Sequence, residues 1–297
     1  MSVTSIMMRY QFGKSDKKRD AGLTTPKDIV RYDNLPYGKC KKWNLLDVYR
    51  PKSAQGKLPV IISVHGGGWV YGTKEVYQFY CMSLAQRGFA VVNFNYRLAP
   101  EQKYPAQMED VNQAVCWVLE RAEEFEFDTE NIFMVGDSAG GHLLSLYASM
   151  CSNPEYAAKY EFKTPENFVP RAVALNCGVY DIVQSIQWQD RDKLMKDLLG
   201  RRYTMEQAES VSPVLYITEK FPPAYVMTAT GDFLKEQPKN LLAQFDRLHV
   251  PYEYKVYGTE ENLLPHVFHC DMRSEDAALC NDEECAFFRA HMKKETL

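Results

Sequence analysis

The stretch from Asn131 to Leu144 constrains the fold of this chain more than any other. An apolar run over residues 132–135 leads into Gly-Asp-Ser-Ala-Gly at positions 136–140, and the chain then becomes amphipathic. This order predicts a strand, a tight turn and a helix, with Ser138 in the turn. Side chains two places before and after such a serine would collide there, and glycine at both places removes the collision. The pattern indicates a nucleophilic serine, although a small-residue turn without chemistry also fits it.

A second glycine-rich motif lies upstream. Residues 65–69 read His-Gly-Gly-Gly-Trp and follow the apolar run 60–64, so another strand opens into a glycine loop. Such a loop can direct bare backbone N–H groups toward an oxyanion, which bulky side chains would obstruct. A flexible loop without function is the alternative, and the nearby serine turn makes it the weaker one.

Three motifs together resemble the hormone-sensitive-lipase-like branch of the α/β-hydrolases. They are the His-Gly-Gly-Gly of residues 65–68, the Tyr-Arg-Leu-Ala-Pro-Glu of residues 96–101 and the Gly-Asp-Ser-Ala-Gly-Gly of residues 136–141. The similarity covers roughly residues 43–295. It implies an α/β-hydrolase fold, with a mostly parallel central sheet flanked by helices and a helical lid. It also implies an oxyanion hole built from the amides of Gly67, Gly68 and Ala139, and a packing role for Arg97 and Glu101.

Strand-like and helix-like segments alternate along the chain, which favours right-handed crossovers in one mostly parallel sheet. We therefore expect residues 1–297 to form a single α/β-hydrolase domain. We expect strands at residues 43–49 (an edge strand), 58–64, 89–96, 132–135, 171–178, 224–230 and 252–257, and helices at 77–87, 105–125, 241–248 and 274–294. Residues 179–223 interrupt the alternation and are interpreted as a mostly helical lid, because a structureless loop of this length is unusual in a compact domain.

A serine hydroxyl needs a histidine to take its proton and a carboxylate to orient that histidine. In α/β-hydrolases the order along the chain is serine, acid, histidine. Asp232 directly follows a predicted strand and is preferred as the acid, while Asp181 and Glu236 are less well placed and a helix N-cap remains an alternative role for Asp232.

Two histidines, His266 and His269, follow the last predicted strand. The resembling family places its base in a His-x-Phe element here, which residues 266–268 match with valine where the family usually has glycine. We therefore predict that His266 is the base. A metal site formed by His266, His269, Cys270 and Asp271 is a weaker alternative, because their spacing matches no recognised ligand pattern.

Composition excludes some other functions. The formal net charge of −4 gives no electrostatic argument for nucleic-acid binding.

Residues 1–42 hold ten Lys or Arg and four Asp, a net charge of +6, and we interpret this basic segment as a cap or a solvated surface lying over an acidic body. No apolar run is long enough to span a membrane, and residues 1–10 lack the apolar core of a signal peptide. The eight cysteines are expected to be free thiols, as in a reducing compartment. The expected location is therefore the cytoplasm.

The predicted activity is the hydrolysis of small, short-acyl esters of the acetyl type through an acyl-enzyme, with Ser138, Asp232 and His266 as catalytic residues and no cofactor or metal. Four aromatic residues, Trp69, Tyr71, Tyr180 and Trp188, are candidates for lining the substrate pocket, although ordinary packing would also explain them. Relatives on this scaffold hydrolyse amides, including aryl formamides, and others are hormone receptors without the catalytic histidine. Both remain alternatives, and the sequence does not fix the oligomeric state.

Overall fold

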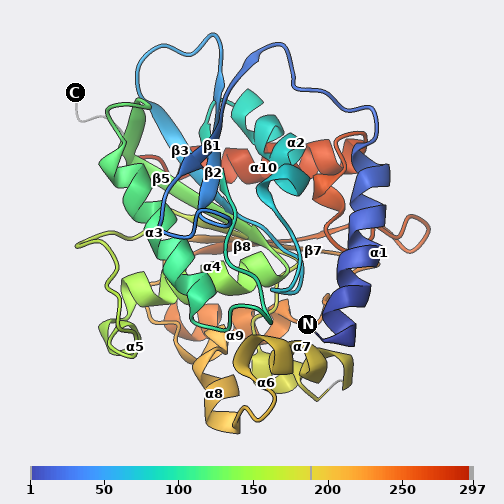
Figure 1. Ribbon diagram of the computed structural model, residues 1–297. Helices are drawn as coiled ribbons and strands as arrows, with labels where there is room; N and C mark the ends of the chain where they lie inside the picture. The colour runs from blue at the N-terminus through green and yellow to red at the C-terminus, as the bar shows by residue number, and fades with distance from the viewer. Residues whose placement is uncertain (1, 188, 294–297) are drawn as a thin grey trace.

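The chain folds around one eight-stranded sheet, which the computed structural model shows for the described residues 2–187 and 189–293 (Figure 1). The strands lie in the order β1-β2-β4-β3-β5-β6-β7-β8. β1 and β2 pair antiparallel with each other, β2 pairs antiparallel with β4, and all other pairs are parallel. The predicted α/β-hydrolase architecture is thus confirmed. The strands are β1 (Ile29–Pro36), β2 (Leu45–Pro51), β3 (Leu58–Val64), β4 (Ala90–Phe94), β5 (Phe127–Asp137), β6 (Val173–Asn176), β7 (Ala224–Ala229) and β8 (Tyr252–Tyr257).

Helices cover both faces of the sheet. The helices α2 and α10 pack on one face, and α3, α4 and α9 pack on the other (Figure 1). The helices are α1 (Val3–Asp20), α2 (Lys74–Gln86), α3 (Ala106–Glu120), α4 (Ala139–Ser152), α5 (Pro154–Ala157), α6 (Ile182–Ser185), α7 (Gln189–Leu199), α8 (Met205–Ser210), α9 (Pro238–Leu248) and α10 (Glu275–Ala290), with 3-10 turns at η1 (Pro213–Leu215) and η2 (Phe268–Cys270).

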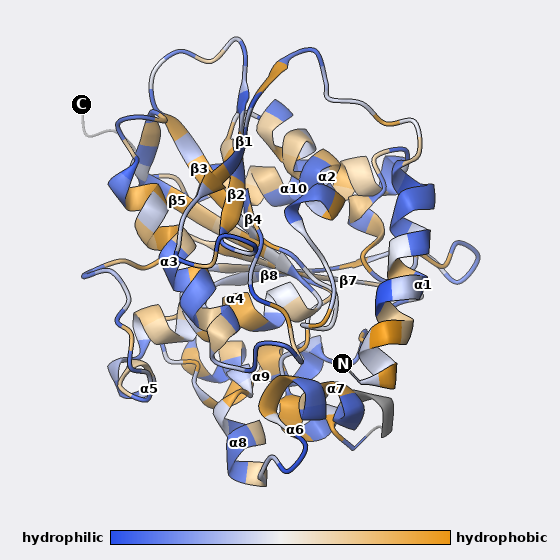
Figure 2. Ribbon diagram, viewed as in Figure 1, coloured by the Kyte–Doolittle hydropathy of each residue, from blue (hydrophilic) through white to orange (hydrophobic). Residues whose placement is uncertain are grey.

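The apolar run of β3 explains why the sheet is covered on both sides. Val60, Ile62 and Val64 join the core beneath α3 and α4, whereas Ile61 joins the core beneath α2 and α10. Successive side chains of a strand point to opposite faces, so a continuous apolar run requires a core on each face. Figure 2 shows this distribution, with hydrophobic residues concentrated on the strands and on the inner sides of the helices.

The prediction that residues 43–49 form an edge strand is wrong. β2 lies inside the sheet, because β1 pairs along its outer side, with a register shift between Tyr32 and Leu35. β1 carries charged and exposed residues on much of its length, which is typical of an edge strand that faces solvent. The basic N-terminal segment therefore supplies a strand of the sheet as well as a helix.

The helix α1 is held against the body by Arg9, within the helix, and by Arg273, which binds its C-terminal end. Arg9 donates two hydrogen bonds of 2.7 Å to the carboxylate of Glu101 and further bonds to the carbonyls of Val70 and Ala99. Arg273 donates to the backbone carbonyls of Arg19 and Ala21 at the C-terminal end of the helix. Glu101 thus has the packing role expected for it, and so does Arg97, which pairs with Asp110.

Residues 179–223, which the sequence analysis interprets as a lid, contain α6, α7, α8 and η1. In Figure 1 they lie together at one end of the molecule, with α7 beside the N-terminal end of α1. A hydrogen bond of 2.5 Å from the Ser2 hydroxyl to Asp197 of α7 joins the two helices. α1 and α7 are therefore in direct contact.

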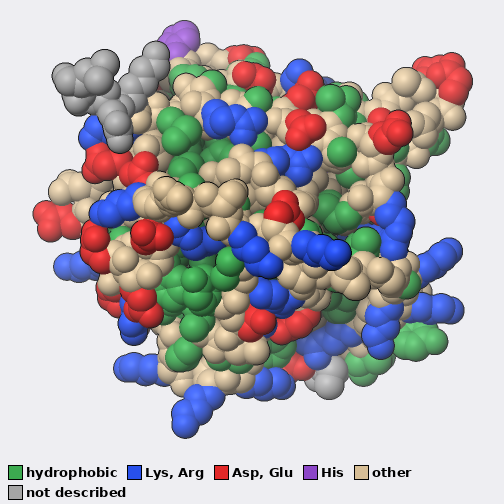
Figure 3. All heavy atoms as spheres, turned by 90° about the horizontal axis from the view of Figure 1, so that it is seen from above, with side chains coloured by type: hydrophobic (Ala, Val, Ile, Leu, Met, Phe, Trp, Pro, Cys, Tyr) green, Lys and Arg blue, Asp and Glu red, His purple; other side chains and the backbone are tan. Residues whose placement is uncertain are grey.

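The cysteines match the sequence-based expectation. All eight cysteines are free. On the face shown in Figure 3, Lys and Arg side chains alternate with Asp and Glu. Among the described residues, no helix combines the length and the apolarity that crossing a bilayer requires.

Candidate active site

Ser138 occupies the turn between β5 and α4 in a backbone conformation that is rare for a side-chain-bearing residue. Its φ is 51° and its ψ is −118°. A Cβ at Gly136 would lie 2.6 Å from the carbonyl oxygen of Gly140, and a Cβ at Gly140 would lie 1.9 Å from that of Val64. Both glycines are therefore required by close backbone contacts, as the motif predicted. The strained turn leaves Ser138 partly exposed between buried neighbours, at the N-terminus of α4.

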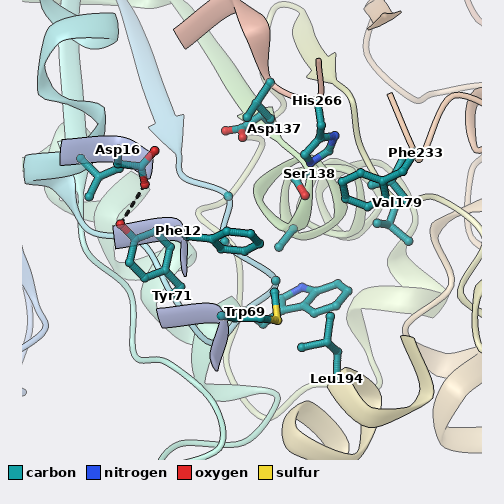
Figure 4. Close-up of a pocket in the computed structure, with 18 of the residues that line it drawn as sticks. Phe12, Asp16, Trp69, Tyr71, Asp137, Ser138, Val179, Leu194, Phe233 and His266 are labelled. Carbon is teal, nitrogen blue, oxygen red and sulfur yellow. Dashed lines mark hydrogen bonds between the residues drawn. The ribbon is translucent and has the colours of Figure 1, made fainter. Parts of the chain in front are cut away.

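Asp232 and His266 meet although 34 residues separate them in the sequence. The Nδ1 of His266 lies 2.7 Å from Oδ1 of Asp232. Burial by itself would raise the pKa of Asp232, but the bond from His266 and further donors from Leu234 N–H and the Thr228 hydroxyl hold it below its ordinary value. An ionised carboxylate on Nδ1 fixes the tautomer in which Nε2 is free to accept a proton. In Figure 4 the His266 ring lies beside the Ser138 hydroxyl.

The loop that carries His266 is strained at the position where the sequence departs from its relatives. Val267 has a φ of 55°, in the left-handed region that β-branched residues rarely adopt. Glycine would occupy this conformation without cost, which explains the usual glycine of the His-x-Phe element. The structure nevertheless places His266 against Asp232, so valine is accommodated here.

The other candidate histidines lie outside the cavity that contains Ser138. His269 is fully buried, its ring packs edge-on against Tyr80, and burial lowers its pKa to about 3. His142 is fully buried in α4, where its Nε2 donates to the carbonyl of Val211 and its Nδ1 accepts from Trp69. Both histidines therefore serve packing.

The glycine loop after β3 faces Ser138. Gly66, Gly67, Gly68 and Ala139 all line the same cavity as Ser138 and His266. Ala139 is the first residue of α4, and the first amides of a helix have no partner within the helix, so its N–H is available to an oxyanion. The loop is anchored because the Gly66 N–H donates to the hydroxyl of Tyr77, 3.0 Å away, which in turn donates to Asp137 at 2.7 Å. Burial raises the pKa of Asp137 to about 6, and the bond from Tyr77 opposes this rise.

Replacement of Gly67 by alanine should reduce kcat for a p-nitrophenyl butyrate substrate by about 10²- to 10³-fold, the usual cost of losing one oxyanion donor. Gly67 has a φ of +109°, and an added Cβ would lie 2.3 Å from the carbonyl oxygen of Tyr71, so the loop would have to move. Gly88→Ala is the matched control, because Gly88 also has a positive φ of +94° but has nothing within 4 Å of an added Cβ. Equal kcat values for the two variants would contradict a catalytic role for the Gly67 amide.

A cavity of about 290 Å³ opens above Ser138. Of the four aromatic residues predicted to line it, Trp69 and Tyr71 do so. The prediction for Tyr180 is wrong, because its side chain is fully buried and does not line the cavity. Its hydroxyl accepts a hydrogen bond from the Gly178 N–H. Trp188 lies outside the described residues.

Several cavity residues were not identified from the sequence. α1 contributes Met8, Phe12, Ser15, Asp16 and Arg19, the lid contributes Val179, Ile182, Leu194 and Met195, and Phe233 and Leu234 follow the acid. The α1 residues recur at intervals of three to four, which is one face of a helix. That periodicity was the available signal, but the many charged residues of this segment obscured it.

One group of side chains could hold a metal ion. Donor atoms of Cys177, Asp232 and His266 lie within 4.8 Å of one another. A thiol, a carboxylate and an imidazole are ligands that Zn²⁺ accepts. The carboxylate and the imidazole are already hydrogen-bonded to each other, so a metal here would displace the proton of the Asp232–His266 pair. This group is not the metal site considered in the sequence analysis. Of the residues in that earlier site, His269 and Cys270 are buried and do not line the cavity.

Comparison with known proteins identifies the family of this chain. The model of the BD-FAE family matches residues 46–241. Esterase LipQ of Mycobacterium tuberculosis is 31% identical over 209 residues, which are 67% of this chain and 48% of LipQ. The ethyl acetate hydrolase of Pseudomonas putida is 34% identical over 208 residues, which are 64% of this chain and 61% of that protein. The chain spans about half the length of the first curated relatives it matches.

Solved structures show the same fold over nearly the whole chain. Esterase B from Lactobacillus rhamnosis superposes with a TM-score of 0.89 at 26% identity, covering 97% of this chain and 94% of that one. A bacterial heroin esterase shares the fold with a TM-score of 0.78 at 21% identity, covering 96% of this chain and 91% of that one. The family match extends over the elements that carry Ser138 and Asp232, and the chain therefore belongs to the BD-FAE family, within the hormone-sensitive-lipase-like esterases of the α/β-hydrolase superfamily.

Proposed function

We propose that this chain is a serine carboxylic-ester hydrolase that acts on small esters with short acyl chains, through a covalent acyl-enzyme. The observation that carries the proposal is the 2.7 Å bond between Asp232 and His266, beside the Ser138 hydroxyl and in the same cavity. All three groups of a serine hydrolase are present, which favours an enzyme over a receptor that has lost its base.

In the proposed reaction, His266 takes the proton of the Ser138 hydroxyl as Oγ attacks the ester carbonyl carbon. The electron pair of the carbonyl bond moves to its oxygen, and the resulting oxyanion accepts hydrogen bonds from the amides of Gly67, Gly68 and Ala139. Collapse of this intermediate breaks the bond to the alcohol, which leaves with the proton from His266. Water then repeats the sequence and releases the acid from Ser138.

The cavity supports a small acyl group. Bulky side chains of Trp69, Leu194 and Met195 limit its apolar side. Two relatives point the same way, since one is an ethyl acetate hydrolase and esterase B was also solved with a tributyrin phosphonate, an analogue with butyryl chains. Acetyl and butyryl groups are the acyl groups we propose.

The test is a series of p-nitrophenyl esters that differ only in the acyl chain. We expect kcat/KM to be highest for acetate or butyrate and at least about tenfold lower for octanoate, if Trp69, Leu194 and Met195 bound the acyl side as proposed. Mass spectrometry after incubation with a phosphonate ester should place one adduct on Ser138. A preference for octanoate would overturn the short-chain proposal, and faster cleavage of p-nitroacetanilide than of p-nitrophenyl acetate would favour an amidase.

A further inference from the structure

The cavity above Ser138 has two chemically different sides. The side formed by the lid and the loop after β7 is apolar, with Val179, Leu194, Met195, Phe233 and Leu234. α1 adds the apolar side chains of Met8 and Phe12 and, next to Tyr71, a polar patch formed by Ser15, Asp16 and Arg19. In Figure 4, Asp16 and Tyr71 lie on the far side of the Phe12 ring from Leu194 and Val179. A ligand that fills the cavity therefore contacts apolar groups at one end and charged groups at the other.

The polar side is fixed by a hydrogen-bonded network. The Tyr71 hydroxyl donates to Oδ2 of Asp16 at 2.8 Å, and Nη1 of Arg19 lies 3.1 Å from Oδ1 of Asp16. Arg19 is itself held by Asp20, which accepts from Nε and Nη2 at 2.7 and 2.8 Å, and by the carbonyl of Val76. These groups are positioned before any ligand binds, so little entropy is lost when a ligand is recognised.

The network keeps both donor and acceptor capacity for a ligand. A carboxylate offers about four acceptor sites and a guanidinium five N–H donors. Asp16 uses one acceptor site on each oxygen, for Tyr71 and for Arg19. Nε and Nη2 of Arg19 donate to Asp20 and Val76, and Nη1 contacts Asp16. Among the described residues, this leaves one hydrogen of Nη1 for a ligand. A hydroxyl group both donates and accepts, and it matches this pair of sites.

The charges exclude other ligand types. Arg19 lies between Asp16 and Asp20, so the three groups together carry a net negative charge that disfavours a carboxylate ligand. The guanidinium next to Asp16 disfavours an ammonium group. Burial raises the pKa of Asp16, and Arg19 and the hydrogen bond from Tyr71 oppose the rise. Because the buried carboxylate is poorly hydrated, hydrogen bonds from a ligand would stabilise it. A neutral hydroxylated group satisfies all of these conditions.

We propose that Asp16, Arg19 and Tyr71 form an alcohol subsite that binds the neutral polyhydroxylated part of an ester, of the glycerol or sugar type. The proposal rests on the proposed esterase function and names its substrate class. The leaving oxygen must lie near His266, which returns the proton to it. Arg19 lines the same cavity as His266, which meets this requirement. The rings of Phe12 and Tyr71, 5.8 Å apart and edge to face, offer apolar surface to the C–H groups of such an alcohol.

The test compares glycerol 1-monobutyrate with n-propyl butyrate, which share the acyl group and the three-carbon alcohol and differ by two hydroxyls. We expect the wild-type protein to favour the glyceryl ester by about tenfold or more in kcat/KM, and Asp16→Ala to reduce that ratio by about tenfold, as expected for loss of a hydrogen bond to a charged group. Asp16→Asn keeps the side-chain shape and should give an intermediate ratio. Asp33→Ala is the control, because Asp33 also pairs with an arginine, Arg31, but lies outside the cavity and should leave the ratio unchanged.

Each other outcome overturns a specific claim. A wild-type ratio near one, or an unchanged ratio in both Asp16 variants whose thermal unfolding matches the wild type, would eliminate the alcohol subsite. Faster cleavage of butyrylcholine than of the glyceryl ester, lost in Asp16→Asn, would show that the subsite binds a cation instead. Failure to cleave any butyrate ester, with no adduct on Ser138, would overturn the esterase function rather than the subsite.

Discussion

Replacement of Ser138 by alanine is expected to lower kcat for p-nitrophenyl butyrate by about 10⁵- to 10⁶-fold, while thermal unfolding changes little. The loss is large because the strained turn presents this hydroxyl beside the His266 ring. The oxyanion amides and the binding cavity would remain, so a residual rate above that of water is expected. The measurement is steady-state hydrolysis by purified wild-type and variant protein.

Ser149→Ala provides the matched control. Ser149 is fully buried in α4, and its hydroxyl has no hydrogen-bond partner among the described residues, so its removal leaves no orphaned group. This variant should hydrolyse the ester at close to the wild-type rate. Activity of Ser138→Ala at the level of Ser149→Ala would show that another group is the nucleophile.

Replacement of Asp232 by asparagine is expected to lower kcat by about 10⁴-fold with little change in KM. The amide would keep the contact to His266 Nδ1 but would favour the opposite tautomer, with the hydrogen on Nε2, and that nitrogen could no longer accept the Ser138 proton. The neutral side chain would also fail to stabilise the imidazolium. The split between kcat and KM, measured with butyrate esters, distinguishes this effect from a loss of binding.

Glu236→Gln tests the alternative acid under the same conditions. Glu236 is exposed and lies one helical turn after Asp232 in the sequence, so it was a possible acid on position alone. Near-wild-type kcat is expected for this variant. A larger loss in Glu236→Gln than in Asp232→Asn would assign the acid to Glu236 and contradict the role proposed for Asp232.

The sheet and the meeting of Asp232 with His266 were predictable because both depend on local patterns. The apolar run of β3 and the glycines around Ser138 determine strands and turns within a few residues, and the order of strands along the chain brings their carboxyl ends to one edge. The bond between Asp232 and His266 follows from that topology, since β7 and β8 are neighbours.

The contribution of residues 1–42 was not predictable in the same way. β1 is an edge strand with exposed charges, so it lacks a clear alternation of apolar and polar residues. In α1 only Ser5 is buried, and Phe12 contacts the rest of the protein chiefly at the cavity. Their positions depend on long-range contacts such as Arg9 with Glu101, which no local pattern encodes. The prediction that Tyr180 lines the cavity was wrong for a different reason. The apolar residues around it in the sequence indicate that it is buried, but they do not show whether its side chain faces the cavity or the core.

The N-terminal segment has two roles, because it supplies both β1 and α1, which are joined by residues 21–28. Removal of this segment would leave the outer side of β2 with a row of unpaired backbone N–H and C=O groups, which readily add strands from other chains. The same removal would open the cavity toward α2 and expose the glycine loop to bulk water. Loss of the segment before β2 would therefore both favour self-association through β2 and remove the α1 side chains from the cavity, so selectivity is best measured on protein in which this segment is intact.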